Sequence, residues 1–326
     1  MNPGCAIIIP SIEFNNDLKK CLVECLKQKK VKVKIFVITN KKINNKLNSK
    51  KILYLNYGNI NMSTKRNRAV KKCSEEFIAF IDSDAYPSRN WLYNAIKILK
   101  KREDIGMVTG PDLPFKNQKG LSYIIGLAHK SFFLSGDKIY RKNLISERIC
   151  SQASSCNMIL KKNLFEKVKG MNQNIYIGED KDFCDRFNLV SKILCSPKVL
   201  IFHKVRNFLP FLFQRFSYGA SLLDLIKTNT AFNLNNLQFF IPLIIVCAYF
   251  LAPFFYIQEN IFFHVYIFNI FLLNFLILVE SIRISINPVR IFKIFFIIKI
   301  NILAFGLGSI FGLLGFKKLN KIYTRR

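Results

Sequence analysis

The sequence predicts an α/β domain built on a mostly parallel sheet flanked by helices, followed by a C-terminal α-helical membrane region. Two observations lead to this fold class. Short apolar runs alternate with amphipathic helical patterns along the N-terminal part of the chain, an order typical of a parallel sheet. Near residue 230, long uncharged segments replace this alternation. We therefore expect one domain over residues 1–230 and a membrane anchor over residues 231–326.

The elements of the first domain follow one another in a β-α-β order. Apolar runs at 5–10 and 33–38 predict two strands, and between them the apolar residues of 17–29 fall on one face of a helix. The same reasoning predicts strands at 51–55, 77–81 and 105–109 and helices at 63–73 and 89–101. Because ligands of such open sheets bind at the carboxyl ends of the strands, we expect a site where these strands end.

The composition limits the partners and the compartment of the chain. Among 326 residues, 50 Lys and Arg outnumber 20 Asp and Glu, which gives a formal net charge of +30. The lysines are scattered and no aromatic-plus-basic recognition motif accompanies them, so we expect no nucleic-acid partner. The nine cysteines form no C-x-x-C pair, which predicts neither a zinc site nor a redox site. With no secretory signal in "MNPGCAIIIP", the first domain is expected to be cytosolic and reduced.

Two carboxylates follow the expected strand at 77–81. Asp82 and Asp84 lie in "FIAFIDSDA", separated by Ser83. If the chain stays extended here, both side chains project to the same side. They would repel each other unless a cation lay between them, and Mg²⁺ binds one or two carboxylates together with phosphate oxygens. The alternative interpretation is a polar turn in which an Asp or Ser caps the next helix.

Further polar residues occur downstream, in "SSCNMILKKNLFEKVKGMNQNIYIGEDKDFCDRF". A strand at 156–160 leads to a short helix, a glycine-containing turn and then Glu179 and Asp180 at the start of another helix. Asp180 could complement the dipole of that helix or act as a general base. His203 ends a later strand, where a structural role and a metal-ligand role both remain open.

Six segments together resemble the family-2 glycosyltransferases of GT-A fold, in their membrane-anchored bacterial form. The resemblance covers residues 5 to about 220 and rests on their order and spacing. The segments are "AIIIPS", "KRNRAV", "FIAFIDSDA", "SSCNMILKKNLFEKVKGMN", "GED" and the terminal His203.

The resemblance implies an inverting transfer of a sugar from a nucleotide-sugar donor, with a divalent metal, Mg or Mn, as cofactor. It implies a role for each matching position, as follows: Pro10, Ser11 and Glu13 near the nucleobase; Arg66 and Asn67 in the donor pocket; Asp82 and Ser83 on the nucleotide; Asp84 on the metal, with Asp82 and His203 as further ligands; Asp180 as catalytic base and Glu179 beside it on the acceptor. Inversion by direct displacement needs one base and a stabilised leaving diphosphate, and no protein nucleophile.

The sequence departs from the family pattern at two places. Family members usually carry an acidic residue after the second strand, but here "FVITNKK" offers Thr39 and Asn40, which leaves the nucleotide open. Processive synthases carry a Q-x-x-R-W motif, whereas "FLFQRFSYG" has adjacent Gln214 and Arg215 and no Trp, which disfavours a processive synthase. Two alternatives to the glycosyltransferase stay open: a polyprenyl-phosphate sugar synthase, and a catalytically dead, membrane-tethered subunit that binds nucleotide sugars.

The C-terminal region predicts a membrane anchor. Residues 239–257 and 261–279 carry no charge, and each can cross ~30 Å of hydrocarbon as a helix. Residues 207–227 suit a helix on the membrane surface, with a core helix as the alternative. We expect a multi-pass protein of the inner (plasma) membrane, with a cytoplasmic catalytic domain, membrane lipid as a partner and a lipid-linked or surface-polysaccharide acceptor.

A third apolar segment, about 290–316, complicates this topology. It contains Lys299 and Asn301, and a charge at the helix centre costs about 2.5–3.5 kcal/mol on insertion scales. Basic residues precede and follow it, and the positive-inside rule assigns both basic stretches to the cytosol. We therefore expect a helix in or along the inner leaflet whose glycines pack against the spans, with a third span from Ile300 as the alternative.

Overall fold

The computed structural model describes residues 3–43, 46–136, 142, 144–223, 234–258 and 261–315, and divides the chain into two compact units. The first comprises Met1–Phe115 and Arg141–Lys204, and the second Lys116–Tyr140 and Val205–Tyr323. This division differs from the boundary expected near residue 230. The second unit starts earlier and includes a segment from inside the expected first domain, because the helices of both segments bury their apolar faces against the C-terminal helices.

The first unit is an α/β domain. Its strands are β1 (Gly4–Pro10), β2 (Lys32–Thr39), β3 (Ile52–Asn56), β4 (Phe77–Phe80), β5 (Ala85–Pro87), β6 (Ile105–Thr109), β7 (Asp112–Pro114), β8 (Arg148–Cys150), β9 (Met158–Lys161), β10 (Lys192–Cys195) and β11 (Ile201–His203). Its helices are α1 (Asn16–Leu26), α2 (Met62–Val70), α3 (Trp91–Lys101), α6 (Lys162–Lys167) and α7 (Glu179–Phe187).

The large sheet has the order β3-β2-β1-β4-β9-β6-β10-β8, and a small sheet has the order β5-β11-β7. Strands β3, β2, β1 and β4 are parallel, with Ile7 opposite Ile35 on one side and Ala79 on the other. β9 runs antiparallel to both β4 and β6, and β8 runs antiparallel to β10. The expected α/β sheet flanked by helices is confirmed, and these two strands make it mixed.

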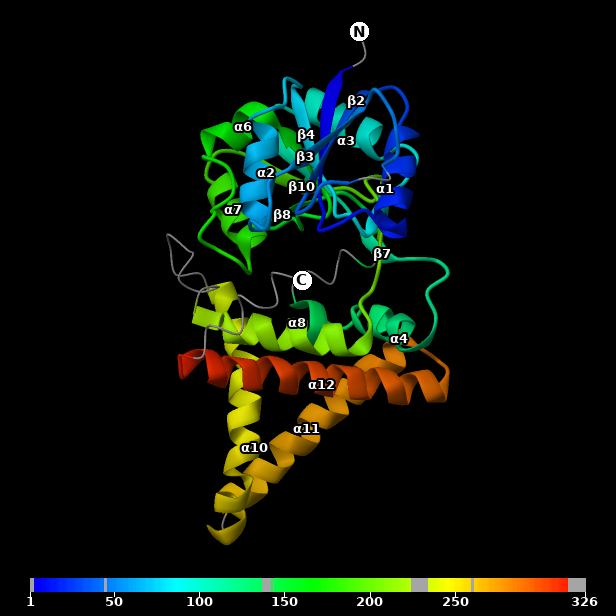
Figure 1. Cartoon of the computed structure of the whole chain (residues 1–326). Helices are drawn as coiled ribbons and strands as arrows, with labels where there is room; N and C mark the ends of the chain where they lie inside the picture. Colours follow the sequence, from blue (N-terminus) through cyan, green and yellow to red (C-terminus); the bar gives the residue numbers. More distant parts are fainter. Residues whose placement is uncertain are drawn as a thin grey trace. The chain divides into compact units, whose positions relative to one another are not determined.

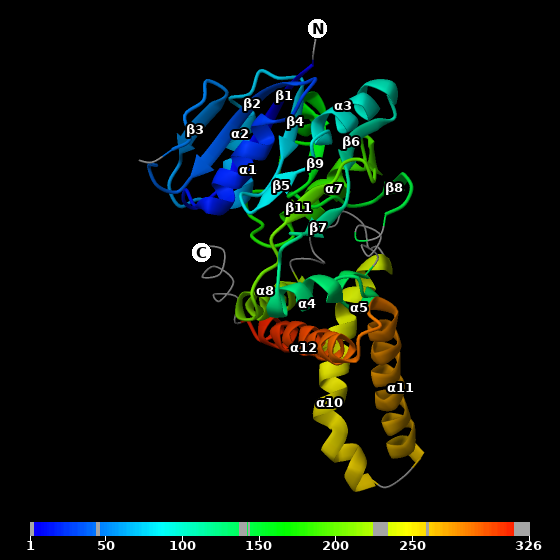
Figure 2. The ribbon, with the colours of Figure 1, turned by 90° about the vertical axis from the view of Figure 1, so that its right-hand side faces the viewer.

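Helices cover both faces of the large sheet (Figures 1 and 2). On one face, alternate residues of β1 such as Ile7 pack in a core with α1 and α3. On the other face, the ring of Phe80 lies 5.7 Å from that of Phe165 in α6, which lies 5.3 Å from that of Phe183 in α7. Each fully buried side chain of this size contributes about 1.5–3 kcal/mol. Strands buried on both faces explain the continuous apolar runs of the sequence.

The second unit is helical. It contains α4 (Gly120–Ala128), α5 (Phe132–Ser135), α8 (Phe208–Ala220), the 3₁₀ helix η2 (Leu234–Phe240), α10 (Ile241–Gln258), α11 (Ile261–Ile284) and α12 (Pro288–Leu313). Both views show α8 alongside α12, while α10 and α11 extend away from this pair as a hairpin (Figures 1 and 2). Tyr266 Oη donates a hydrogen bond to Ala248 O, 3.1 Å away, within the hairpin.

Glycines let α12 approach its neighbours closely. A Cβ on Gly308 would lie 2.1 Å from Phe216 O in α8, and one on Gly312 would lie 2.3 Å from Ala220 O. A Cβ on Gly306 would lie 2.4 Å from Pro242 O in α10. The glycines were expected to pack against the two spans, but only Gly306 does so. Gly308 and Gly312 contact α8, because α8 and α12 lie side by side, and a Cβ on Gly315 would meet no atom of the described residues within 4 Å.

Within the part of the chain that the structure describes, two helices are long and apolar enough to cross a bilayer, by length and composition. They are Phe263–Ile284 and Pro288–Leu313, while Leu237–Leu251 is a shorter apolar helix. The expected spans 239–257 and 261–279 coincide in sequence with α10 and α11, whereas the second helix that is long enough to span is α12, which was expected in or along the inner leaflet. The end of the expected surface helix (224–227) and the basic stretch 317–326 lie outside the described residues.

Candidate active site

The candidate site lies at the carboxyl ends of β1, β2 and β4, which are neighbouring parallel strands. Pro10 ends β1, and Ser11 continues it with a hydrogen bond from its backbone N to Ile38 O of 2.8 Å. Ser11 Oγ donates to the backbone carbonyl of Glu13 at 2.8 Å. Pro10 and Ser11 are buried, whereas Glu13 is exposed. The predicted nucleobase segment is thus an ordered loop at the expected edge.

Asp82 and Asp84 lie on a turn, and this corrects the expected extended geometry. β4 ends at Phe80, and Ala85 N donates to Asp82 O at 3.1 Å, so Ser83 and Asp84 form the turn before β5. After this turn, β5 leaves the large sheet and pairs with β11 in the small sheet. Both carboxylates nevertheless approach the same group. The turn brings them together, and alternation of side chains along a strand does not.

That common group is the imidazole of His203, the last residue of β11. Its Nε2 lies 3.4 Å from Asp84 Oδ1 and 3.7 Å from Asp82 Oδ2. The backbone helps to fix this approach, because Lys204 N donates to Asp84 O at 3.0 Å. Burial lowers the pKa of His203, but the carboxylates of Asp84 and Asp82 outweigh it and raise this pKa above its usual value. All three residues predicted to hold a metal are therefore together.

Arg66 joins the Asp82 carboxylate to the start of α7. Its guanidinium lies 3.2 Å from Asp82 Oδ1 and 3.3 Å from Glu179 Oε1, and its side chain is only 3% exposed. Burial, followed by the neighbouring Asp180, raises the pKa of Glu179 to about 7, while Arg66 opposes this rise. Charge-assisted pairs of this kind hold side chains in fixed positions.

Asp180 lies in the first turn of α7. Gly178, the residue before the helix, has a φ of 87°, a left-handed conformation that glycine adopts at no steric cost. Asp180 Oδ1 accepts a hydrogen bond from Lys181 N at 2.9 Å, which orients its carboxylate. The predicted base thus lies next to Glu179, which the Arg66 pair links to Asp82.

The side chain of Asn67, next to Arg66 in α2, contacts the turn before α7. Its Nδ2 donates to Met171 O at 2.7 Å, and its Oδ1 accepts from Met171 N at 2.9 Å. Gly170 has a φ of 69°, and a Cβ there would lie 2.8 Å from Asn67 Oδ1. Both hydrogen-bonding ends of the Asn67 side chain therefore hold the turn before α7, while its place in the donor pocket stays a prediction.

Lys65 is a site residue that the sequence did not identify. Its side chain is completely buried, and its Nζ donates to Ser11 O at 2.9 Å and also to Asn40 Oδ1. Burial, followed by the neighbouring Arg66, lowers its pKa to about 8. Asn40 follows Thr39 at the end of β2, the region where family members usually carry an acidic residue. The sequence feature that could have indicated Lys65 is its position in "KRNRAV", but only the fold shows that its partners are Ser11 and Asn40.

Cys156 is a second residue that the sequence did not identify. Its Sγ, a carboxylate oxygen of Asp82 and a ring nitrogen of His203 all lie within 4.8 Å of one another. Cys156 is buried, and its Sγ lies 3.3 Å from Ser154 Oγ. Cysteine spacing could not reveal this cluster, because its members come from three separate parts of the chain.

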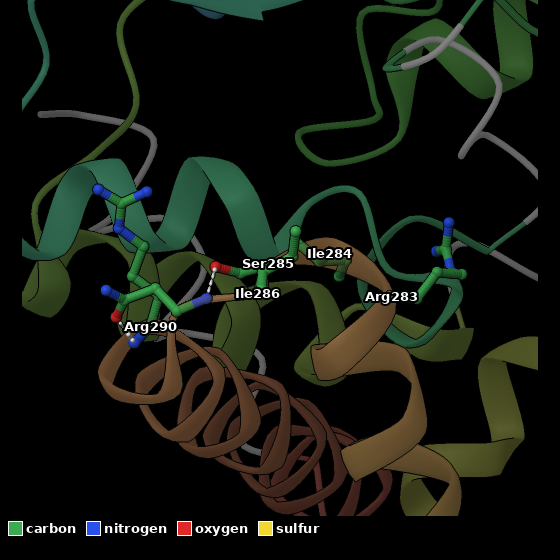
Figure 3. A pocket seen from close by; sticks show the side chains of 6 residues that line it. Arg283, Ile284, Ser285, Ile286 and Arg290 are labelled. Carbon is green, nitrogen blue, oxygen red and sulfur yellow. Dashed lines mark hydrogen bonds between the residues drawn. The ribbon is translucent and has the colours of Figure 1, made fainter.

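An open hollow of about 500 Å³ lies elsewhere, at the turn between α11 and α12 (Figure 3). Arg283 and Arg290 line it from opposite sides of the turn. It belongs to the helical unit, and none of the predicted site residues lines it. We therefore assign the chemistry to the cluster at the sheet edge and not to this hollow.

The sheet, with a site at its carboxyl edge, is that of the GT-A fold. The chain belongs to glycosyl transferase family 2, whose sequence model matches residues 6–168, half of the chain. Pre-mycofactocin glycosyltransferases from two strains of Mycobacterium tuberculosis are 23% identical over 167 residues, which covers 49% of this chain. The match spans only 34% of the length of these relatives.

A likeness among solved structures extends over almost the whole chain. The mannosyltransferase PcManGT from Pyrobaculum calidifontis, in complex with GDP-Man and Mn²⁺, has a TM-score of 0.61 at 12% identity. The likeness covers 96% of this chain and 88% of that protein. At this identity it shows a shared fold.

Proposed function

We propose that the chain is an inverting, metal-dependent glycosyltransferase that moves a sugar from a nucleotide-sugar donor to a membrane-associated acceptor. The observation that carries this proposal is the convergence of Asp82, Asp84 and His203, linked by Arg66 to the start of α7. Family membership supports the reaction class, and the fold relative solved with GDP-Man and Mn²⁺ supports the type of donor and cofactor.

The residues at the carboxyl edge fit a divalent metal. The Nε2 atom of His203 lies 3.4 Å from Asp84 Oδ1 and 3.7 Å from Asp82 Oδ2, and such O and N donors suit Mg²⁺ or Mn²⁺. Asp84 would be the main ligand, with Asp82 and His203 beside it. A bound divalent ion would neutralise the charge of the leaving diphosphate.

The donor would extend from this cluster along the edge. Pro10 and Ser11 at the end of β1 would lie beside the nucleobase, with Lys65 holding the Ser11 carbonyl in place. Arg66 and Asp82 would border the ribose and diphosphate. Because Arg66 pairs with both Asp82 and Glu179, it also limits the repulsion that these carboxylates would exert on a diphosphate.

Asp180 would deprotonate the acceptor hydroxyl. As the acceptor oxygen forms its bond to the anomeric carbon, the bond from that carbon to the diphosphate oxygen breaks, and the hydroxyl proton moves to Asp180. Attack opposite the leaving group inverts the anomeric configuration. The hydrogen bond from Lys181 N orients the Asp180 carboxylate, and the pair with Arg66 leaves Glu179 to position α7.

The helical unit would attach the enzyme to the membrane, with α10 and α11 inserted and α12 along the surface. The apolar window of α11 is 11% buried within the protein, whereas that of α12 is 50% buried. α12 packs along α8, which has 13 residues and therefore a length of about 20 Å, too short to span. A spanning α12 would draw α8, with Gln214 and Arg215, into hydrocarbon.

The turn between α11 and α12 supports the orientation of this anchor. Arg283 and Arg290 flank this turn (Figure 3), where Arg283 pairs with Glu280 at 2.8 Å and the guanidinium of Arg290 lies 5.5 Å from the centre of the Tyr123 ring. The positive-inside rule assigns such a turn to the cytosolic face. We therefore propose a cytoplasmic catalytic domain on the inner (plasma) membrane and a lipid-linked or surface-polysaccharide acceptor, because an anchor raises the local concentration of membrane substrates.

A donor screen tests the proposal. The full chain in detergent or nanodiscs is incubated with a panel of nucleotide sugars, Mn²⁺ or Mg²⁺ and extracted membrane lipid, and the anomeric configuration of any product is read by NMR. Asp180→Asn is expected to bind donor normally while transfer falls by about 10²-fold or more. The matched control is Asp185→Asn, one turn further along α7, where the carboxylate pairs with Lys181 at 2.8 Å.

Each alternative has its own outcome in this screen. Transfer by Asp180→Asn within a few-fold of wild type would remove the base and indicate a phosphate acceptor, as in a polyprenyl-phosphate sugar synthase. Tight donor binding without transfer or hydrolysis by the wild type would indicate a binding subunit. A product with retained configuration would contradict inversion.

A further inference from the structure

Cys156 lies among the proposed metal ligands. Its Sγ, a carboxylate oxygen of Asp82 and a nitrogen of His203 are all within 4.8 Å of one another. Ligands bound at 2.0–2.3 Å to one ion lie at most about 4.6 Å apart. Small side-chain rotations would therefore bring all three donor atoms onto one ion.

The backbone beside Cys156 is fixed by its neighbour Asn157. The Asn157 side chain accepts from Trp91 Nε1 at 2.8 Å and donates to Gly110 O at 3.1 Å and Val199 O at 2.9 Å. Its backbone carbonyl accepts from Thr109 Oγ1 at 2.6 Å. These hydrogen bonds fix the position of Asn157. The adjacent Cys156 thiol is therefore held near the carboxyl ends of β4 and β11, close to Asp82 and His203.

A thiol changes which ions such a site prefers. Carboxylate and water oxygens suit Mg²⁺ and Mn²⁺, whereas thiolate and imidazole ligands suit Zn²⁺ and Co²⁺. Three protein ligands with further positions open to a ligand oxygen are typical of catalytic zinc sites. An ion bound to sulfur displaces the thiol proton, so one sulfur–metal bond forms and one proton passes to solvent.

We propose that Cys156 is a ligand in the divalent-cation site, together with Asp82 and His203, and that this site binds thiophilic cations such as Zn²⁺, Co²⁺ and Cd²⁺ more tightly than Mg²⁺. This inference rests on the proposed function, since it concerns the same metal site. It adds a ligand that cysteine spacing excluded, and it gives the chain a metal preference that the carboxylates alone would not give.

The test is a cobalt titration of the full chain in detergent, in a Cys247→Ser background that removes the exposed cysteine. Wild type is expected to develop the near-ultraviolet thiolate-to-cobalt absorption band. Cys156→Ser is expected to lose the band and to bind Co²⁺ more weakly by at least the ~10-fold to 100-fold that loss of an outer partner costs. The matched control is Cys21→Ser, because the Cys21 thiol lies 3.7 Å from the Asp82 backbone carbonyl and should leave the band unchanged.

A second variant keeps the test decisive if Cys156→Ser does not fold. Cys156→Asp offers an oxygen donor at the same position, and it is expected to bind Mn²⁺ or Mg²⁺ at least as well as wild type and Co²⁺ without the sulfur band. Cobalt bound without the band in wild type, or a band that survives either substitution, would overturn the inference. Glycosyl transfer with Mn²⁺ is measured on the same samples: a band without transfer would contradict only the proposed function, and transfer without a band only the thiol ligand.

Discussion

The two compact units hold their buried polar groups in different ways. In the α/β unit, buried charges such as Lys65 and Arg66 each contact two oxygen partners at the carboxyl edge of the sheet. In the helical unit, the buried polar residues of α12 are Asn301 and Ser309, and close approach depends on glycines. Pairs of side chains thus stabilise the first unit, whereas close helix packing at glycines stabilises the second. Substitutions should therefore damage the two units by different mechanisms.

The largest effect on stability is expected from Arg66→Gln. Removing the buried guanidinium leaves Asp82 and Glu179 without their shared cation, and breaking a buried pair costs about 3–5 kcal/mol of unfolding free energy. Arg68→Gln is the control, because Arg68 is exposed on the same helix and its guanidinium lies 5.4 Å from the centre of the Tyr57 ring. Denaturant unfolding measures both. Equal stability of the two variants would mean that the pairs do not stabilise the first unit.

Gly308→Val should damage the helical unit and leave the α/β unit intact. Its Cβ would meet Phe216 O, which α8 cannot move without losing its packing on α12, and overpacking costs typically about 1–3 kcal/mol. Leu313→Val, at an exposed position near the end of the same helix, is the control. Thermal unfolding in detergent should report a lower transition for Gly308→Val with unchanged nucleotide binding. Loss of nucleotide binding in parallel would argue against separate units.

Lys65 should make a contribution to stability that depends on pH. The folded pKa of about 8 lies below the ordinary 10.5, so between these values the unfolded chain binds a proton that the folded chain has lost. The unfolding free energy of wild type should therefore rise with pH in this window relative to Lys65→Met, by at most about 1.4 kcal/mol per pH unit. Lys71→Met, at an exposed lysine that follows α2, should show no such trend. If the difference in unfolding free energy between wild type and Lys65→Met did not change with pH, burial would not lower the pKa of Lys65.

Much of the α/β unit could be predicted from the sequence, because its signals are local. The apolar runs and the periodicity of α1 and α3 located the central strands and helices within a few residues. The turn at Asp82–Asp84 was missed because the pairing of β5 with β11, which requires it, joins segments far apart in the chain. Lys65 and Cys156 were missed for the same reason: only the fold brings Asn40 to Lys65 and His203 to Cys156.

The organisation of the helical unit was harder to predict. Hydropathy identified α10, α11 and α12, but it does not say which helix packs on which. Residues 116–140 were not expected to join this unit. The apolar sequence pattern of a helix such as α4 is the same whether the helix packs on a sheet or on other helices. Its partner is set by contacts of Ile124 and Ile125 with α8 and α12, which no local pattern records.

The central claim is that Asp82, Asp84 and His203 bind a divalent ion together with a nucleoside diphosphate. Calorimetric titration of the full chain with UDP or GDP, with and without Mn²⁺, tests it most directly. Wild type should bind one of them in a Mn²⁺-dependent manner, and Asp84→Asn should lose that dependence. The control Asp17→Asn, which removes only the partly exposed pair with Lys204 at 2.7 Å, should retain it. Unchanged affinity of Asp84→Asn in the presence of Mn²⁺ would contradict the claim.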